Sequence, residues 1–147
     1  MRKYFVLLLF MTASFGFTQQ IEYINSTEHL KRKRPFSQAT VVNNMIYLSG
    51  QIGTLPNGTL VQGGIEAETQ QVMTNIKTLL ESMGSNLNQV IKCSCMLEDI
   101  KDWSKMSAVY ATFFDKSKLP ARSAFAGSGL ALGAKVEIEC MALRSTN

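Results

Sequence analysis

The chain has 147 residues, of which 46% are hydrophobic and 18% are charged, which is enough apolar material for one domain with a sizeable core. This composition excludes an intrinsically disordered chain, and the sequence shows no internal repeat of the kind that builds solenoids. Fifteen Lys and Arg against eleven Asp and Glu give a net charge of +4, a surplus too small to indicate nucleic-acid binding by itself.

The first 18 residues have the pattern of a secretory signal peptide. Arg2 and Lys3 precede an apolar run over residues 4–10, and small residues follow it. Because this run is shorter than the roughly 20 residues of a membrane-spanning helix, an uncleaved anchor is the weaker alternative. We expect residues 1–18 to be a signal peptide and residues 19–147 to form one domain. The mature protein would then be secreted or periplasmic, without membrane contact after cleavage.

Residues 19–35 form a polar lead-in, in which residues 21–24 suit an additional short strand. The lead-in contains four consecutive cations from Lys31 to Arg34. We expect this run to be a solvated segment, with an anion-binding or RNA-contacting patch as the alternative.

Residues 39–49 contain two β-branched apolar runs on either side of Asn43 and Asn44. Since asparagine tolerates the left-handed backbone conformation of tight turns, this pattern predicts a β-hairpin. Residues 53–64 are rich in glycine and contain a proline, which is typical of a loop.

Two later segments have the apolar spacing of amphipathic helices. The first covers residues 65–83 and ends before Gly84, and the second begins after Asp102, which is a suitable N-cap. Strands are predicted over residues 90–97, 122–125 and 135–143. The coarse order β-β-α-β-α-β predicts an α+β domain with two helices on one face of a sheet. The other face would be partly apolar, and an oligomer would bury it.

Three cysteines, Cys93, Cys95 and Cys140, lie in the predicted mature chain. Cys93 and Cys95 are two residues apart on a predicted strand, so their side chains should point to the same face. We expect buried free thiols, with a disulfide from Cys93 or Cys95 to Cys140 as the alternative in an oxidising compartment. Two thiols and the lone His29 are too few ligands, so we predict no metal site.

Few polar side chains are placed to carry out chemistry. Neither a Ser-His-Asp pattern nor a phosphate-binding glycine motif is present in the sequence. Arg122 and Glu137 each lie on a predicted strand, and an arginine in this setting can bind a carboxylate through two parallel hydrogen bonds. The alternative is a structural ion pair between Arg122 and Glu137. Glu137 also shares a strand face with Glu139, as it would on an ordinary solvated surface.

Five short strings occur in the order and spacing found in the reactive-intermediate deaminases, the RidA-like or YjgF-like proteins, also described as endoribonuclease L-PSP. They are RPFSQA, IYLSGQIG, YATFF, LPARS and GAKVEIECMAL, and the chain resembles this family over about residues 33–144. The resemblance implies a chorismate-mutase-like fold and a homotrimer whose sheets form a barrel, with sites in clefts between subunits. It also implies cofactor-free hydrolysis of enamines or imines, such as 2-aminoacrylate, to 2-keto acids and ammonia.

The resemblance implies roles for individual residues. Arg122 matches the arginine that binds the substrate carboxylate, and Glu137 matches the acidic residue that positions the attacking water. Ser49 and Gly50 match residues that line the site. A general-base role for Glu137 needs a raised pKa, which burial favours and a nearby Arg122 opposes.

The sequence also departs from the family pattern at three positions expected to line the site. Phe36 stands where a tyrosine is usual, Ser107 where an asparagine is common, and Ala124 where many members have a cysteine. These departures bear on the substrate and the rate more than on the reaction class.

We therefore expect an imine or enamine deaminase that binds small imino and keto acids. One alternative is a non-catalytic carboxylate-binding or chaperone-like trimer of the same fold, which the missing hydroxyl at Phe36 favours. A second alternative is ribonuclease or RNA-binding activity. Its only local support is the basic run from Lys31 to Arg34, which lacks interleaved aromatic residues for base stacking, so we expect no nucleic-acid partner.

Overall fold

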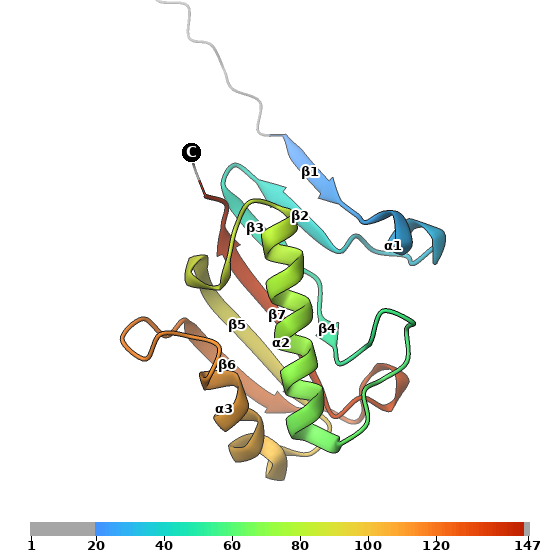
Figure 1. Ribbon diagram of the computed structural model, residues 1–147, viewed down its shortest axis with the longest axis vertical. Helices are drawn as coiled ribbons and strands as arrows, with labels where there is room; N and C mark the ends of the chain where they lie inside the picture. The colour runs from blue at the N-terminus through green and yellow to red at the C-terminus, as the bar shows by residue number, and fades with distance from the viewer. Residues whose placement is uncertain (1–19, 146–147) are drawn as a thin grey trace, which may run out of the picture.

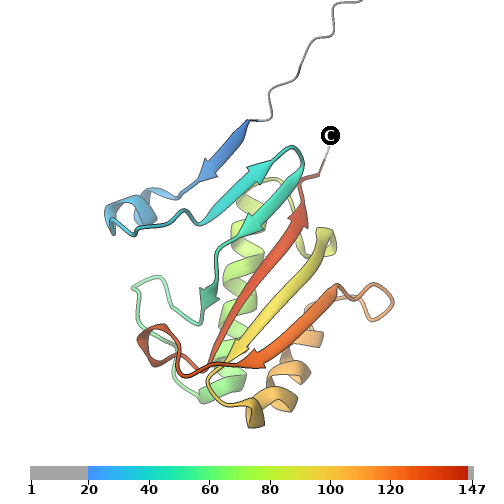
Figure 2. The same cartoon turned by 180° about the vertical axis from the view of Figure 1, so that it is seen from behind.

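The computed structural model describes residues 20–145, and the predicted signal peptide, residues 1–18, lies outside them. The chain forms a single twisted sheet with two long helices packed on one face (Figure 1). No helix within residues 20–145 covers the opposite face of the central strands (Figure 2). The predicted α+β class, with helices on one side of the sheet, is confirmed.

The helices and strands follow the predicted series closely. They are β1 (Ile21–Ile24), α1 (Thr27–Lys31), β2 (Ala39–Val42), β3 (Met45–Leu48), β4 (Gln51–Ile52), α2 (Gly64–Ser82), β5 (Val90–Leu97), α3 (Trp103–Ala111), β6 (Ala121–Ala126) and β7 (Val136–Leu143). The sequence did not predict α1 or β4, which are short. The strand order is β1-β2-β3-β7-β5-β6, and β4 also pairs with β7. Among the paired strands of residues 20–145, only β5 and β6 run parallel.

The predicted hairpin is formed by β2 and β3. Val42 and Met45 are cross-strand partners, so two residues connect the strands. Asn43 has a φ of 54°, the left-handed conformation that asparagine adopts more readily than most residues. The turn chemistry therefore fixes the register of both strands.

The core lies between α2 and the inner face of the sheet. Val72, Met73, Ile76 and Leu80 of α2 are fully buried, as the helical spacing predicts. They pack against a sheet whose central strand β7 alternates strictly. Its buried side chains are Val136, Ile138, Cys140 and Ala142, and the residues between them are partly or fully exposed. Strand β7 thus separates the core from the uncovered face.

The predicted N-cap of the second long helix is not formed by the Asp102 side chain. A short 3₁₀ turn over Ile100–Asp102 precedes α3 and places Asp102 in a helical conformation, with φ −82° and ψ −1°. A capping side chain needs an extended residue, so Asp102 makes no capping hydrogen bond. Asp99 caps the turn instead, because its Oδ1 accepts the backbone N–H of Lys101 at 2.9 Å.

The expectation of free thiols is wrong for two of the three cysteines. Cys93 on β5 and Cys140 on β7 are direct cross-strand partners with their Cα atoms 4.2 Å apart, and they form a disulfide. The antiparallel register brings the two side chains together on the buried face. Cys95 is also buried, as predicted from its spacing, and remains a free thiol.

Thiol titration of the oxidised protein in denaturant should detect one reactive thiol per chain, that of Cys95. Reducing the disulfide should lower the free energy of unfolding by up to about 4 kcal/mol, because it closes a loop with a sequence separation of 47 residues. A Cys95→Ser variant is the matched control and should give no signal without reductant. Detection of three thiols in the unreduced wild type would contradict the disulfide.

Candidate functional site

Glu137 lies on the uncovered sheet face, near the start of the central strand β7. It is the Cα partner of Ile52 on β4 and of Met96 on β5, so strands flank it on both sides. Gly50, just before β4, lies against its side chain. A Cβ atom at Gly50 would overlap the Glu137 carboxylate. Glycine at this position therefore gives the carboxylate its space.

The pKa of Glu137 is raised above the ordinary glutamate value, mainly by partial burial and secondarily by the negative charge of Glu139. Among residues 20–145, no side chain or backbone N–H donates a hydrogen bond to the Glu137 carboxylate in this structure. Arg122 does not counteract the effect of burial within one chain, because it lies on the other face of the sheet. The carboxylate is thus free to accept a proton from a bound water molecule.

Ser49 precedes Gly50 in the chain, and hydrogen bonds join it to the segment before β2, which carries Phe36. The hydroxyl of Ser49 donates to the carbonyl of Ser37 at 2.7 Å, and its backbone N–H donates to the carbonyl of Gln38 at 3.0 Å. Phe36 has its side chain half exposed, and its carbonyl accepts a hydrogen bond from Nε2 of the buried His29 at 2.6 Å. Four predicted site residues, Glu137, Gly50, Ser49 and Phe36, therefore belong to one group.

Arg122 lies on the helix-covered side of β6, the strand that ends the sheet order. It is in register with Cys93, whose side chain is buried under the helices. The guanidinium carbon is 5.4 Å from the ring centre of Trp103 and 5.0 Å from that of Tyr110, both on α3. These distances are typical of cation–π contacts, which orient the guanidinium and leave its N–H groups available.

Arg122 forms no ion pair with an acidic residue among residues 20–145, so a structural pair with Glu137 does not form within one chain. The registers explain this result. Arg122 is level with Cys93 on the inner face of the sheet, whereas Glu137 is level with Met96 on the outer face. The two side chains of one chain therefore point away from each other.

Two further predicted site residues lie with Arg122. Ala124 is two residues further along β6 on the same face and packs against the core. Ser107 lies on α3 between Trp103 and Tyr110, and its hydroxyl is buried without a hydrogen-bond partner in the described chain. The Tyr110 hydroxyl is likewise buried without a hydrogen-bond partner in the described chain. Trp103 and Tyr110 lie on the helix that the sequence predicts after Asp102, but the sequence analysis did not identify them as partners of Arg122.

The structure thus divides the predicted site into two groups. We call Glu137, Gly50, Ser49 and Phe36 the carboxylate group, and Arg122, Ala124 and Ser107 the arginine group. The carboxylate group lies on the uncovered sheet face, and the arginine group lies between β6 and α3. Within residues 20–145, no three His, Cys, Asp or Glu side chains are grouped so that they could hold a metal ion.

The sequence matches the family model described as Endoribonuclease L-PSP over residues 26–144. The chain belongs to the L-PSP family, whose members include the RidA and YjgF proteins. A 2-iminobutanoate/2-iminopropanoate deaminase from Bos taurus is 41% identical over 111 residues, which cover 75% of this chain and 80% of the bovine protein.

Two other relatives of this L-PSP chain differ in how they are described. A Lactococcus lactis protein named as a regulator, AldR, is 44% identical over 109 residues, covering 74% of this chain and 86% of that protein. The crystal structure of RidA from an Antarctic Psychrobacter species superposes with a TM-score of 0.71 at 35% identity. That match covers 75% of this chain and 89% of the other. The fold of the L-PSP chain is therefore that of solved RidA proteins.

In this L-PSP chain, the Glu137 carboxyl should titrate above the ordinary range of a glutamate, which carbon-detected NMR of the side chain can measure. A Glu139→Gln variant should lower the pKa of Glu137, because the like charge is removed, but the pKa should stay raised, because burial is the larger cause. Glu81→Gln, on the exposed side of α2, is the matched control and should leave the pKa of Glu137 unchanged. A Glu137 pKa at or below the ordinary value would contradict this description.

Proposed function

We propose that the protein is a cofactor-free deaminase that hydrolyses reactive 2-imino and 2-enamino acids to 2-keto acids and ammonia. The observation that carries the proposal is the half-buried Glu137 carboxylate, which has a raised pKa and lies against Gly50 without a partner in the described chain. A base of this kind can hold a water molecule and take its proton near neutral pH. The relative from Bos taurus, which is named as an imine deaminase, supports the same reaction class.

The proposed reaction needs only water and two side chains. In a 2-imino acid, the protonated nitrogen makes C2 electrophilic. Glu137 accepts a proton from water while the water oxygen bonds to C2 and the π electrons move to nitrogen. The proton then passes from Glu137 to the amine nitrogen, and the C–N bond breaks as the carbonyl forms and Glu137 takes the hydroxyl proton. Glu137 passes this proton to the departing ammonia, which restores the carboxylate. The products are a 2-keto acid and an ammonium ion.

Arg122 supplies the anchoring contact in this proposal. Its planar guanidinium can donate two parallel hydrogen bonds to the substrate carboxylate. Trp103 and Tyr110 hold the guanidinium from the α3 side, which lowers the entropic cost of binding. The buried hydroxyls of Ser107 and Tyr110 add polar groups next to it.

A trimer is the assembly in which the two groups would form one site. Within a chain, Arg122 and Glu137 point to opposite faces, so a complete site needs the arginine group of one chain and the carboxylate group of a neighbour. The uncovered sheet face also carries exposed apolar side chains, which include Tyr47, Met141 and Phe125. Association of three sheets around a common axis would bury these side chains.

A carboxylate-binding trimer without turnover is the second candidate. It is favoured by Phe36, which supplies no hydroxyl to the carboxylate group, and by the Lactococcus relative, which is named as a regulator. Release of ammonia from freshly generated 2-iminobutanoate separates the two candidates, because a pure binding protein would not accelerate it.

Glu137→Gln should lower kcat/KM for 2-iminobutanoate by about 100-fold to 10,000-fold, the usual contribution of a general base. Because the pKa of Glu137 is raised in the folded state, its ionised form disfavours folding above that pKa. The variant should therefore melt no lower than the wild type at neutral pH. Glu139→Gln on the same face is the matched control and should keep most of the activity. Wild-type turnover by Glu137→Gln would refute the proposed mechanism.

Mixed assembly tests whether neighbouring chains share each site. Arg122→Ala and Glu137→Gln should each be nearly inactive alone. In a cyclic trimer that contains both variants, one of the three interfaces combines an intact Arg122 with an intact Glu137. After equal mixing by co-refolding, about three quarters of the trimers contain both variants, and each of these has one intact site of three. The mixture should therefore have about a quarter of the wild-type activity. Light scattering should show the trimer mass. A monomer, or a trimer without recovery, would contradict shared sites.

A further inference from the structure

An open cavity of about 460 Å³ lies next to Phe36, at the junction of β1, α1 and the segment before β2. Its lining includes two cations, Lys33 and Arg34, and the neutral polar side chains of Tyr23, Asn25 and Ser37. None of its lining residues is acidic. The cavity is therefore electropositive and provides several hydrogen-bond donors.

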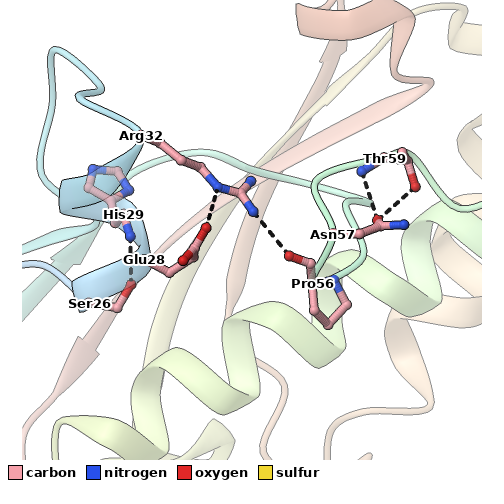
Figure 3. A network of polar contacts seen from close by, with 7 residues as sticks. All are labelled: Ser26, Glu28, His29, Arg32, Pro56, Asn57 and Thr59. Carbon is pink, nitrogen blue, oxygen red and sulfur yellow. Dashed lines mark hydrogen bonds and ion pairs between the residues drawn. The ribbon is translucent and has the colours of Figure 1, made fainter.

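The basic run of the sequence divides into residues with different partners. Arg32 is already engaged, because its Nε donates to Glu28 at 3.2 Å and its guanidinium donates to the carbonyl of Pro56 at 3.0 Å (Figure 3). Lys33 and Arg34 form no ion pair with any residue of the described chain. All four cations of the run are exposed, which confirms the predicted solvated segment, and Lys33 and Arg34 keep their charge available for a ligand.

The walls of the cavity are held by a network of hydrogen bonds. Asn25 donates to the Ser37 hydroxyl at 3.1 Å and accepts the backbone N–H of Gln38 at 3.0 Å. The buried His29 donates to the Phe36 carbonyl, and its ring lies edge-on to the Phe36 ring at 5.4 Å between centres. The Arg34 guanidinium carbon lies 6.0 Å from the centre of the same Phe36 ring. The structure thus presents Arg34 and Phe36 side by side.

The cavity adjoins the carboxylate group. The carbonyl of Ser37, a residue that lines the cavity, accepts a hydrogen bond from the Ser49 hydroxyl. Gly50 follows Ser49 in the chain and lies against the Glu137 side chain. Tyr23, which also lines the cavity, lies on the uncovered sheet face. It is the cross-strand partner of Thr40, which pairs with Tyr47, and Tyr47 pairs in turn with Met141. Met141 and Glu137 alternate with the buried side chains of β7 and therefore share the outer face. Tyr23 lies three strands from β7 in the sheet order, so the Ser37 end of the cavity is the end that leads to Glu137.

We infer that this cavity binds a second anionic group of the substrate, so that the preferred substrates are 2-imino acids whose side chain ends in a carboxylate. The inference rests on the proposed function. Arg122 would bind the carboxylate at C1, and Arg34 and Lys33 would bind the one at the end of the side chain. A neutral alkyl side chain would leave both cations in water and gain nothing from them.

The test compares two imines that an amino-acid oxidase generates in place, 2-iminoglutarate from glutamate and 2-iminobutanoate from 2-aminobutanoate. The wild type should have the higher kcat/KM for 2-iminoglutarate. Arg34→Gln should lower the ratio of the two kcat/KM values about tenfold, the usual effect of losing one charged hydrogen bond. Lys31→Gln, in the same basic run but outside the cavity lining, removes the same charge and should leave the ratio unchanged.

An unchanged ratio in Arg34→Gln, or an equal loss in Lys31→Gln, would overturn the inference and leave the proposed function standing. If the wild type hydrolyses neither imine, the proposed function fails, and calorimetry with the corresponding keto acids still tests the cavity. The inference about the cavity is supported if the wild type binds 2-oxoglutarate more tightly than 2-oxobutanoate and Arg34→Gln loses this preference. Equal binding of the two keto acids would overturn it.

Discussion

The strict alternation of strand β7 is the constraint on which the rest of the structure depends. This strand pairs with β3, β4 and β5, so it forms the centre of the sheet. Its small and β-branched residues fill the core beneath α2, which forces Glu137 and Glu139 onto the outer face. The packing of the core thus places a carboxylate where β4 and β5 flank it and no helix of the described chain covers it. A one-residue slip in register would bury both glutamates and expose the core residues.

The same arrangement separates the two groups of site residues. Strand β6 ends the sheet, and Arg122 points from it toward α3. Trp103 and Tyr110 of this helix contact the guanidinium. Gly50 leaves space for the carboxylate, and the two rings orient the guanidinium. If the site is shared between chains as proposed, activity depends on assembly, because neither half alone provides both the base and the anchor. The raised pKa of Glu137 is the energetic cost of this design, since a desolvated carboxylate disfavours folding when it ionises.

The cavity next to Phe36 lies at the rim of the proposed site. In this chain, the rim has Phe36 beside Arg34, and His29 and Asn25 fix the backbone that carries them. In the proposed function, Phe36 and the two cations without an ion pair among residues 20–145 would act on the substrate side chain and not on the reacting centre. The disulfide between Cys93 and Cys140 stabilises the two central strands and suits an oxidising compartment, which is where the predicted signal peptide would direct the protein.

The sequence by itself determined the elements whose signals are local. The period of α2, the asparagine turn between β2 and β3, and the alternation of β5 and β7 all depend on neighbours a few residues apart. The five strings also identified the family and named Arg122 and Glu137. Only the tertiary structure decided which of these residues meet, because register and sheet order join positions far apart in the chain. It paired Cys93 with Cys140, separated Arg122 from Glu137 and placed Trp103 and Tyr110 against Arg122. It also distinguished Arg32, which forms an ion pair with Glu28, from Arg34, which forms none within residues 20–145.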